Sequence, residues 1–192
     1  MMSAITGLFI ALCWAIFLVF IVYAAFSAKR RVESDRRWTW SWLVLALIVA
    51  AVALVRVSKH LPVYVTAMVL PHTVGVCLGA DLLALAGLFV ASWGRVALGR
   101  NWNLFPSFQD HHELIQSGPY AYVRHPMYSG LTLMFLGAVI WNGAGYGFIL
   151  FFCCSLGTWF KLRQEEKLLT RHFGAEYSSY RSRVKALIPF VI

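Results

Sequence analysis

The chain has 192 residues, of which 60% are hydrophobic and only 13% are charged. Soluble domains are about 45–50% apolar and about 25% charged, so this composition indicates an integral membrane protein that forms a single compact unit. Lys and Arg outnumber Asp and Glu by 17 to 8. Basic residues that cluster beside membrane spans explain this excess without a nucleic-acid partner.

The N-terminal half predicts three spans. The first, Ala4–Phe26, carries no charge and is long enough to cross a hydrocarbon core of about 30 Å. Basic residues and then tryptophans follow, as in a cytoplasmic loop that returns to the membrane, and a second span is expected over Trp40–Val57. The segment Leu61–His72 is too short to cross, so we expect an extracytoplasmic interfacial loop or short helix. The third span is predicted over Thr73–Trp93.

Asp81 is the only acidic residue inside a predicted span. Burying a charge in a membrane is costly, so such a residue is a functional candidate. The alternative is that Asp81 faces a partner helix or that its carboxylate reaches toward the interface. The four cysteines and six histidines show no metal-ligand spacing, and we predict no metal site and no disulfide framework.

Two apolar runs of about 15 residues follow in the C-terminal half, Met127–Trp141 and Tyr146–Phe160. The sequence Asn-Gly-Ala-Gly between them is typical of a tight turn, so we expect a helical hairpin. The second arm should continue out of the membrane as a helix over Lys161–His172. Gly174 is expected to end that helix, and a short helix should follow over Ala175–Lys185.

The predicted fold is therefore an all-α membrane protein with about five transmembrane helices, of which the last two form a tight hairpin. An N-terminus outside and a C-terminus in the cytoplasm would place 15 of the 17 Lys and Arg residues on the cytoplasmic side. This multi-pass arrangement fits the positive-inside rule. It also brings the loop before the hairpin and the charged C-terminal helix to one side, which predicts a site facing the cytoplasm.

The segment 117–128 is the first candidate site, because it is polar, aromatic and rich in turn residues. Pro126 disfavours helical backbone at the residue before it, so a helix cannot run through His125 but can begin just after it. Arg124 contributes a permanent cation, and His125 contributes a side chain that titrates near neutral pH. Fixed polar groups in an irregular segment beside a membrane indicate a binding site.

The charged run 161–169 is the second candidate site. On a helix, Lys161 and Glu165 are neighbours one turn apart, and Arg163 and Glu166 are neighbours in the same way. A solvated, ion-paired helix end would also give this pattern. Its predicted position, level with the turn at His125, favours a functional role.

These two segments resemble the isoprenylcysteine carboxyl methyltransferases. Residues 118–128 read Gly-Pro-Tyr-x-x-x-Arg-His-Pro-x-Tyr, and residues 165–180 read Glu-Glu-x-x-Leu-x-x-x-Phe-Gly-x-x-Tyr-x-x-Tyr. An apolar hairpin separates them, and the resemblance extends from about Asn101 to Phe190. The motifs are shared with a wider set of membrane methyltransferases that includes phospholipid N-methyltransferases, and sterol reductases have a related C-terminal layout. The motifs do not themselves define the methyl acceptor.

The resemblance implies that residues 99–192 form the catalytic half, behind N-terminal transmembrane helices in residues 1–98. It implies S-adenosylmethionine as the methyl donor, S-adenosylhomocysteine as the product, and a lipophilic or prenylated acceptor that is reached from the membrane lipid. The cofactor pocket would be formed by the loop before the hairpin and the C-terminal helices. The residues implied to bind the cofactor are Gln109, His112, Glu113, Leu114, Ile115, Tyr120, His125, Pro126, Met127 and Tyr128.

The resemblance also implies a basic residue and a glutamate four residues apart on the acceptor side, which are Lys161 and Glu165 in this chain. The family has Arg at the position of Lys161, so Arg163 is a second candidate for the basic role. An amine or phospholipid N-methyltransferase is the alternative enzyme. A non-catalytic membrane scaffold and a reductase are more distant alternatives, and the reductase would need a nicotinamide cofactor, for which no G-x-G-x-x-G motif is present.

Overall fold

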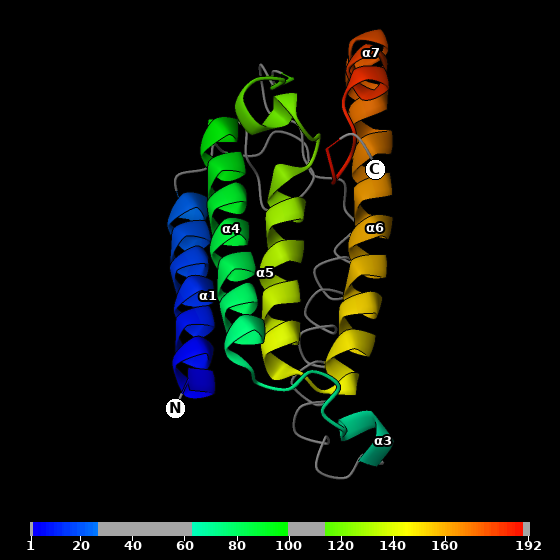
Figure 1. Cartoon of the computed structure of the whole chain (residues 1–192). Coiled ribbons are helices and arrows are strands. Elements are labelled where there is room, and N and C mark those ends of the chain that lie inside the picture. Colours follow the sequence, from blue (N-terminus) through cyan, green and yellow to red (C-terminus); the bar gives the residue numbers. More distant parts are fainter. Residues whose placement is uncertain (1, 27–62, 100–113, 190–192) are drawn as a thin grey trace.

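The computed structural model describes residues 2–26, 63–99 and 114–189. Within these ranges the chain is helical, with two isolated β-bridges and no strand. Four long helices run side by side, with α7 at one end of the molecule and α3 at the other (Figure 1). The elements are α1 (Met2–Phe26), α3 (Val63–Thr66), α4 (Val74–Leu98), the 3₁₀ helix η3 (Gly118–Ala121), α5 (Pro126–Asn142), α6 (Gly145–Phe173) and α7 (Ala175–Arg183).

Three of the described helices are long and apolar enough to cross a membrane: α1 over Met2–Ala24, α4 over its full length, and α6. The first and third predicted spans are therefore present as helices, and α4 continues to Leu98. At 17 residues, α5 is about 26 Å long, slightly shorter than a hydrocarbon core. The second predicted span lies outside the described residues, and the described part of the interfacial segment contains α3.

The helix boundaries follow from local sequence signals. Pro126 is the first residue of α5, where its missing N–H has no intrahelical partner to lose. Gly143 ends α5 with a left-handed φ of 70°, which a residue with a Cβ adopts only under strain. The apolar arm and the charged run after it form one continuous helix, α6, and Gly174 follows its last residue with a φ of 56°. The predicted helical continuation of the second apolar arm and its end at Gly174 are both confirmed.

The closest helix packing in the described residues is between α4 and α5. A Cβ on Gly87 would lie 2.5 Å from the carbonyl oxygen of Gly130, and a Cβ on Gly130 would lie 2.5 Å from that of Gly87. The two backbones are therefore in direct contact, as in membrane helix pairs with small residues at the interface. Helix α1 covers the other side of α4, in a core of Ile10, Cys13, Phe17, Ala80, Ala84, Ala91 and Met134. The tightness of the α5–α6 hairpin remains a prediction.

Asp81 faces a partner helix, which is the structural alternative considered for this residue. Its Oδ2 atom accepts a hydrogen bond of 3.2 Å from the Thr6 hydroxyl on α1, and Thr6 is itself buried. A carboxyl group between two apolar helices is stabilised by such a donor, because few other polar partners are in reach. Asp81 therefore links α1 to α4, far along the bundle from the charged residues described below.

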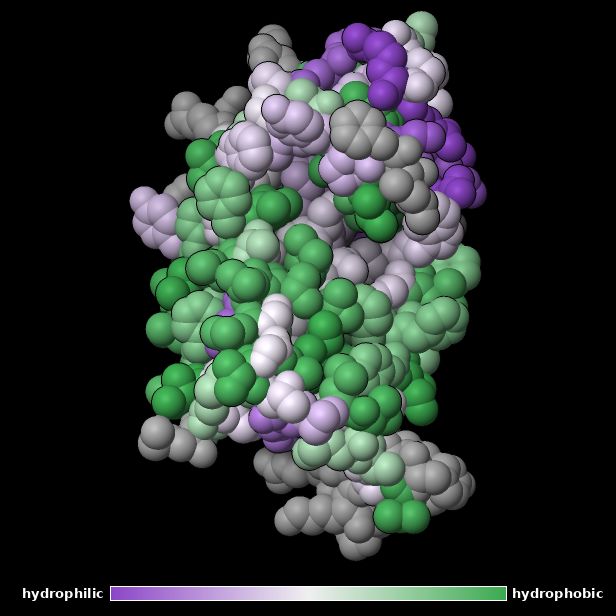
Figure 2. All heavy atoms as spheres, viewed as in Figure 1, coloured by the Kyte–Doolittle hydropathy of each residue, from purple (hydrophilic) through white to green (hydrophobic). Residues whose placement is uncertain are grey.

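The two ends of the bundle differ in charge. Every Lys and Arg in the described residues lies on the last turn of α4, on the turn before α5, on the second half of α6, or in the segment that follows it. Figure 2 shows hydrophilic residues gathered at this end, above a broad apolar belt. The belt and the polar end are what a helical bundle in a membrane requires.

Candidate functional site

The polar turn before α5 is held by the tail that follows α7. The backbone N–H of Arg124 donates to the carbonyl of Lys185 at 2.8 Å, and that of His125 donates to the carbonyl of Ala186 at 3.0 Å. These bonds form a short parallel pairing between two segments about 60 residues apart. The tail thereby fixes the backbone from which the Arg124 and His125 side chains project.

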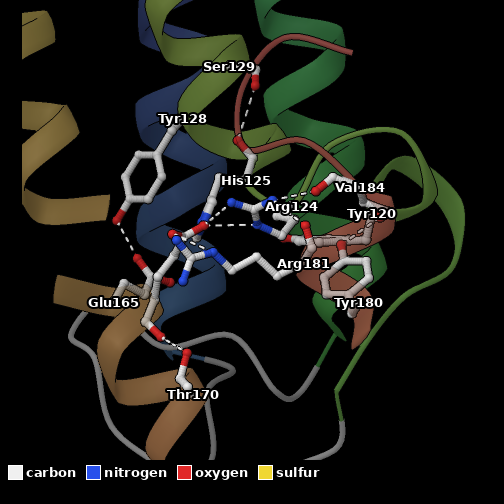
Figure 3. Close-up of polar contacts among 11 residues, drawn as sticks. Tyr120, Arg124, His125, Tyr128, Ser129, Glu165, Thr170, Tyr180, Arg181 and Val184 are labelled. Carbon is white, nitrogen blue, oxygen red and sulfur yellow. Dashed lines mark hydrogen bonds and ion pairs between the residues drawn. The ribbon is translucent and has the colours of Figure 1, made fainter. Parts of the chain in front are cut away.

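A buried carboxylate lies at the centre of this end of the molecule. Glu166 is 3% exposed, and its Oε1 atom accepts a hydrogen bond of 2.9 Å from Arg124 Nε. The Nε2 atom of His125 lies 3.5 Å from Oε1, and the Nε atom of Arg181 lies 3.8 Å from Oε2. Figure 3 shows Arg124 and His125 of the turn and Arg181 of α7 converging on this region of α6. Because a buried charge is stable only when it is paired, this cluster fixes the three segments together.

Glu166 was not predicted to be a site residue. Sequence spacing paired it with Arg163 on the same helix, whereas in the structure its partner is Arg124, which is 42 residues away. The signal that could have identified it is the double glutamate of the motif. Adjacent residues on a helix point about 100° apart, so Glu165 and Glu166 must face different neighbours. If one of them lies on the acceptor side, the other is expected to pair elsewhere.

Tyr120 fixes η3 between α4 and α7. Its side chain is buried, its hydroxyl donates to the carbonyl of Gly94 at 3.4 Å, and its own carbonyl accepts a bond of 2.6 Å from the Tyr180 hydroxyl. Burial raises the pKa of Tyr120, and the nearby Glu165 carboxylate raises it further. Burial also raises the pKa of Tyr180, to about 12. Both phenols therefore remain neutral donors at physiological pH.

Tyr128 brings the two candidate segments into contact. Its hydroxyl donates to Glu165 Oε2 at 2.9 Å, and the Lys161 ammonium lies 5.4 Å from the centroid of its ring. The His125 and Tyr128 rings are 5.8 Å apart. Lys161 and Glu165 lie on one face of α6 because they are four residues apart. The structure thus gathers a cation, a carboxylate and two rings at one point.

Arg163 does not join this group. Its guanidinium lies 4.5 Å from the centroid of the Trp159 ring, and its side chain is exposed. A residue two positions after Lys161 points about 200° away from it around the helix. Of the two basic candidates for the acceptor side, Lys161 is therefore the one beside Tyr128 and Glu165.

The remaining predicted residues lie around the same turn or outside the described ranges. Pro126 and Met127 pack on α4 at Gly94, where an added Cβ would lie 3.0 Å from the ring of Pro126. Leu114 and Ile115 are partly buried in the segment before η3. Gln109, His112 and Glu113 fall outside the residues that the structure describes. Within the described ranges, no three His, Cys, Asp or Glu residues are grouped as metal ligands.

The fold and the site define a class: a helical protein with helices long and apolar enough to cross a membrane, and with a cluster of tyrosine, histidine, glutamate and lysine side chains at one end. The model of the phospholipid methyltransferase family matches residues 74–176. This range covers more than half of the chain, from α4 to the start of α7. The chain belongs to this family.

Curated relatives agree with the resemblance read from the motifs. The protein-S-isoprenylcysteine O-methyltransferase of Schizosaccharomyces pombe is 37% identical over 111 residues, which are 55% of this chain and 46% of that protein. The enzyme of the same name from Rattus norvegicus is 32% identical over 57% of this chain and 42% of its own length. Protein-S-isoprenylcysteine O-methyltransferase B of Arabidopsis thaliana is 31% identical over 43% of each chain. This chain thus spans less than half the length of each of these three relatives.

Proposed function

We propose that the chain is an integral membrane methyltransferase that transfers a methyl group from S-adenosylmethionine to a lipophilic acceptor, most like the C-terminal carboxylate of a prenylated cysteine. The observation that carries this proposal is the contact of Tyr128 with both Lys161 and Glu165, beside His125. Membership of a methyltransferase family and the names of the relatives support methyl transfer.

The side chains around the turn suit a sulfonium cofactor. S-adenosylmethionine supplies an electrophilic methyl group on a cationic sulfur. The rings of His125 and Tyr128 and the carboxylate of Glu165 offer the aromatic faces and negative charge that stabilise such a cation. Pro126 and Met127 add apolar surface. The proposed cofactor set also keeps the residues implied by the motifs, Gln109, His112, Glu113, Leu114, Ile115 and Tyr120.

The chain's own residues then have distinct tasks. A carboxylate acceptor is already ionised at neutral pH, so no base is needed to activate it. Lys161 binds this anion, and Glu165, held by the Tyr128 hydroxyl, limits the directions in which the Lys161 ammonium can point. The buried pair of Arg124 and Glu166 fixes the turn that carries His125. Catalysis rests on alignment and on exclusion of water.

An amine acceptor, such as a phospholipid headgroup, is the second candidate function, and the description of the matched family favours it. In this reading Glu165 binds the ammonium form of the acceptor and takes its proton before methyl transfer. Lys161 would then repel the ammonium group of the acceptor. The two readings therefore make opposite predictions for the removal of Lys161.

We also propose that the site faces the cytoplasm and that the N-terminus lies outside. The start of α1 lies at the end of the bundle opposite α7, as Figure 1 shows. The described Lys and Arg residues all lie at the α7 end, and basic residues favour the cytoplasmic side.

The test is calorimetry of the detergent-solubilised protein with S-adenosylmethionine, S-adenosylhomocysteine and NADPH. We expect binding of the first two, and a roughly tenfold loss of affinity in His125→Ala, the cost of about one hydrogen bond or ring contact. Tyr122→Phe is the matched control, because Tyr122 lies on the same turn and is 61% exposed. Binding of NADPH alone would overturn the proposal in favour of a reductase.

Acceptor chemistry is tested by methyl transfer to S-farnesylcysteine and to phosphatidylethanolamine. For a carboxylate acceptor, Lys161→Gln should raise the KM for the acceptor, whereas Glu165→Ala should chiefly lower kcat. Lys161→Gln should leave donor affinity within a few fold of the wild-type value, whereas Glu165→Ala should also weaken donor binding, because it removes the negative charge beside the sulfonium. Methylation of the lipid alone, with a lower KM in Lys161→Gln, would select the amine reading instead.

A further inference from the structure

The face of α6 that points away from the site carries an ordered row of exposed residues. Phe152, Leu156 and Phe160 recur every four positions along its apolar part, with exposed fractions of 68%, 45% and 55%. After a step of three residues, Arg163, Lys167 and Arg171 continue the row, again four positions apart, and all three are exposed. At about 100° per residue, the six positions fall within about one third of the helix circumference. An apolar row therefore leads directly into a basic row.

The basic row has no counter-ion among the described residues. The carboxylates of the same helix point elsewhere: Glu166 is buried against Arg124, and Glu165 accepts from Tyr128. Within ranges 2–26, 63–99 and 114–189, no carboxylate lies within ion-pair distance of the three cations. Three like charges in a row repel one another unless an anion binds between them.

Arg163 is oriented by an aromatic ring at the boundary between the two rows. Its guanidinium lies 4.5 Å from the centroid of the Trp159 ring. Stacking of this kind favours the arginine cation and holds its planar donors in one direction, which suits a phosphate group. Tryptophan itself prefers the level of the lipid headgroups. The contact with Trp159 therefore favours the level of the lipid headgroups for Arg163.

We propose that this face of α6 is a binding site for an anionic phospholipid. The phosphate lies among Arg163, Lys167 and Arg171, and an acyl chain lies along Phe152, Leu156 and Phe160. The basic row runs over nine residues, from Arg163 to Arg171, or about 12 Å of helix, which covers the headgroup layer above the hydrocarbon core. A zwitterionic lipid binds less well because its own cation meets the same row. This inference does not depend on methyl transfer.

The experiment measures retention of lipid by native mass spectrometry of the full chain in detergent. Dioleoyl phosphatidylglycerol is titrated against dioleoyl phosphatidylcholine, which has the same acyl chains. We expect preferential binding of the anionic lipid, and about a fivefold loss of that preference for each charge removed in Arg163→Gln and in the Arg163→Gln, Lys167→Gln, Arg171→Gln triple variant. These side chains are exposed, so the variants should fold, and circular dichroism checks this.

The control is Lys185→Gln, which removes one charge at the same end of the molecule from an exposed side chain outside the row. An equal loss of preference in Lys185→Gln and Arg163→Gln would show only a general effect of net charge and would overturn the proposal. So would equal retention of the two lipids. Displacement of the lipid by the same concentration of free glycerol phosphate would show a phosphate site without a lipid site, and would overturn it too.

Discussion

The two ends of the bundle are held together by different kinds of contact. At the site end, charged side chains from three segments meet at the buried carboxylate of Glu166. At the other end, the backbone N–H groups of Val69 and Leu70 both donate to the carbonyl of Gly143, at 2.7 and 3.1 Å. The first end therefore depends on its charged side chains in addition to the backbone bonds between the turn and the tail. The second depends on the backbone conformation of a turn.

Of the substitutions that test this comparison, Glu166→Gln should destabilise the protein most. It removes the negative charge from a buried ion pair and leaves the Arg124 guanidinium without its counter-ion, where the two side chains are 8% and 4% exposed. We expect a loss of about 3 kcal/mol in the free energy of unfolding. Because the turn carrying His125 loosens, affinity for S-adenosylmethionine should also fall. Thermal unfolding in detergent and calorimetry measure the two effects.

The matched control is Glu176→Gln on α7. Glu176 lies at the same end but is exposed, and its contact is a hydrogen bond of 3.3 Å from Gln116. Its loss should change stability by less than about 0.5 kcal/mol. If the two substitutions destabilise the protein equally, the buried cluster is not what holds the site end together.

Gly143→Ala should have the second-largest effect, at the opposite end. The residue has a φ of 70°, and a Cβ would lie 2.5 Å from the carbonyl oxygen of Leu70. Left-handed strain and this clash together should cost about 2 kcal/mol. Gly174→Ala separates the two causes, because Gly174 has a φ of 56° and no atom within 4 Å of the added Cβ. Equal losses of thermal stability in the two variants would show that the contact with Leu70 contributes nothing.

Local rules explain why the sequence predicted much of the fold. Pro126 and Gly174 act on their own backbone, so the start of α5 and the end of α6 could be read without a structure. The contact of Gly87 with Gly130 could not, because it joins two helices far apart in the chain. The pairing of Glu166 with Arg124 was missed for the same reason: helical spacing offered Arg163, a nearer partner.

The sequence predicted some contacts of the candidate site and left others open. The motif resemblance selected Tyr128 and Glu165, and the structure places them in contact. Whether Lys161 or Arg163 lies beside them could have been decided from helical periodicity, since only the residue four positions before Glu165 shares its face. The residues of the loop before η3 stay a prediction. Their roles come from the resemblance and not from any contact described above.

Tyr180→Phe should have a smaller effect, again at the site end. The substitution removes a buried hydrogen bond of 2.6 Å to the carbonyl of Tyr120 and should cost about 1 kcal/mol at pH 8. Burial raises the pKa of Tyr180 from 10.0 to about 12 in the folded state. Its stabilising contribution is therefore fully present below pH 10 and is lost as the pH rises toward 12.

The advantage of the wild-type protein over Tyr180→Phe should accordingly shrink between about pH 10 and pH 12, in unfolding measurements made on both proteins in the same detergent. A constant difference over this range would mean that the phenol is as ionisable in the folded protein as in the unfolded chain. The opposite end carries no such pH dependence in its backbone bonds, so Gly143→Ala should be equally destabilising at both pH values.

His72→Ala should have the smallest effect, and it sharpens the contrast most directly. The Nε2 atom of His72 lies 2.7 Å from the carbonyl oxygen of Trp141, in the last turn of α5, so this is a side-chain contact at the end where backbone bonds hold the turn. The residue is exposed, and water can replace its hydrogen bond. We therefore expect a loss of about 0.5 kcal/mol in thermal unfolding, well below that of Gly143→Ala. A loss of stability as large as that of Glu166→Gln would contradict this comparison. The His72 imidazole would then hold the loop before α4 against α5, just as the Glu166 carboxylate holds the turn at the other end, and both ends would depend on side-chain identity.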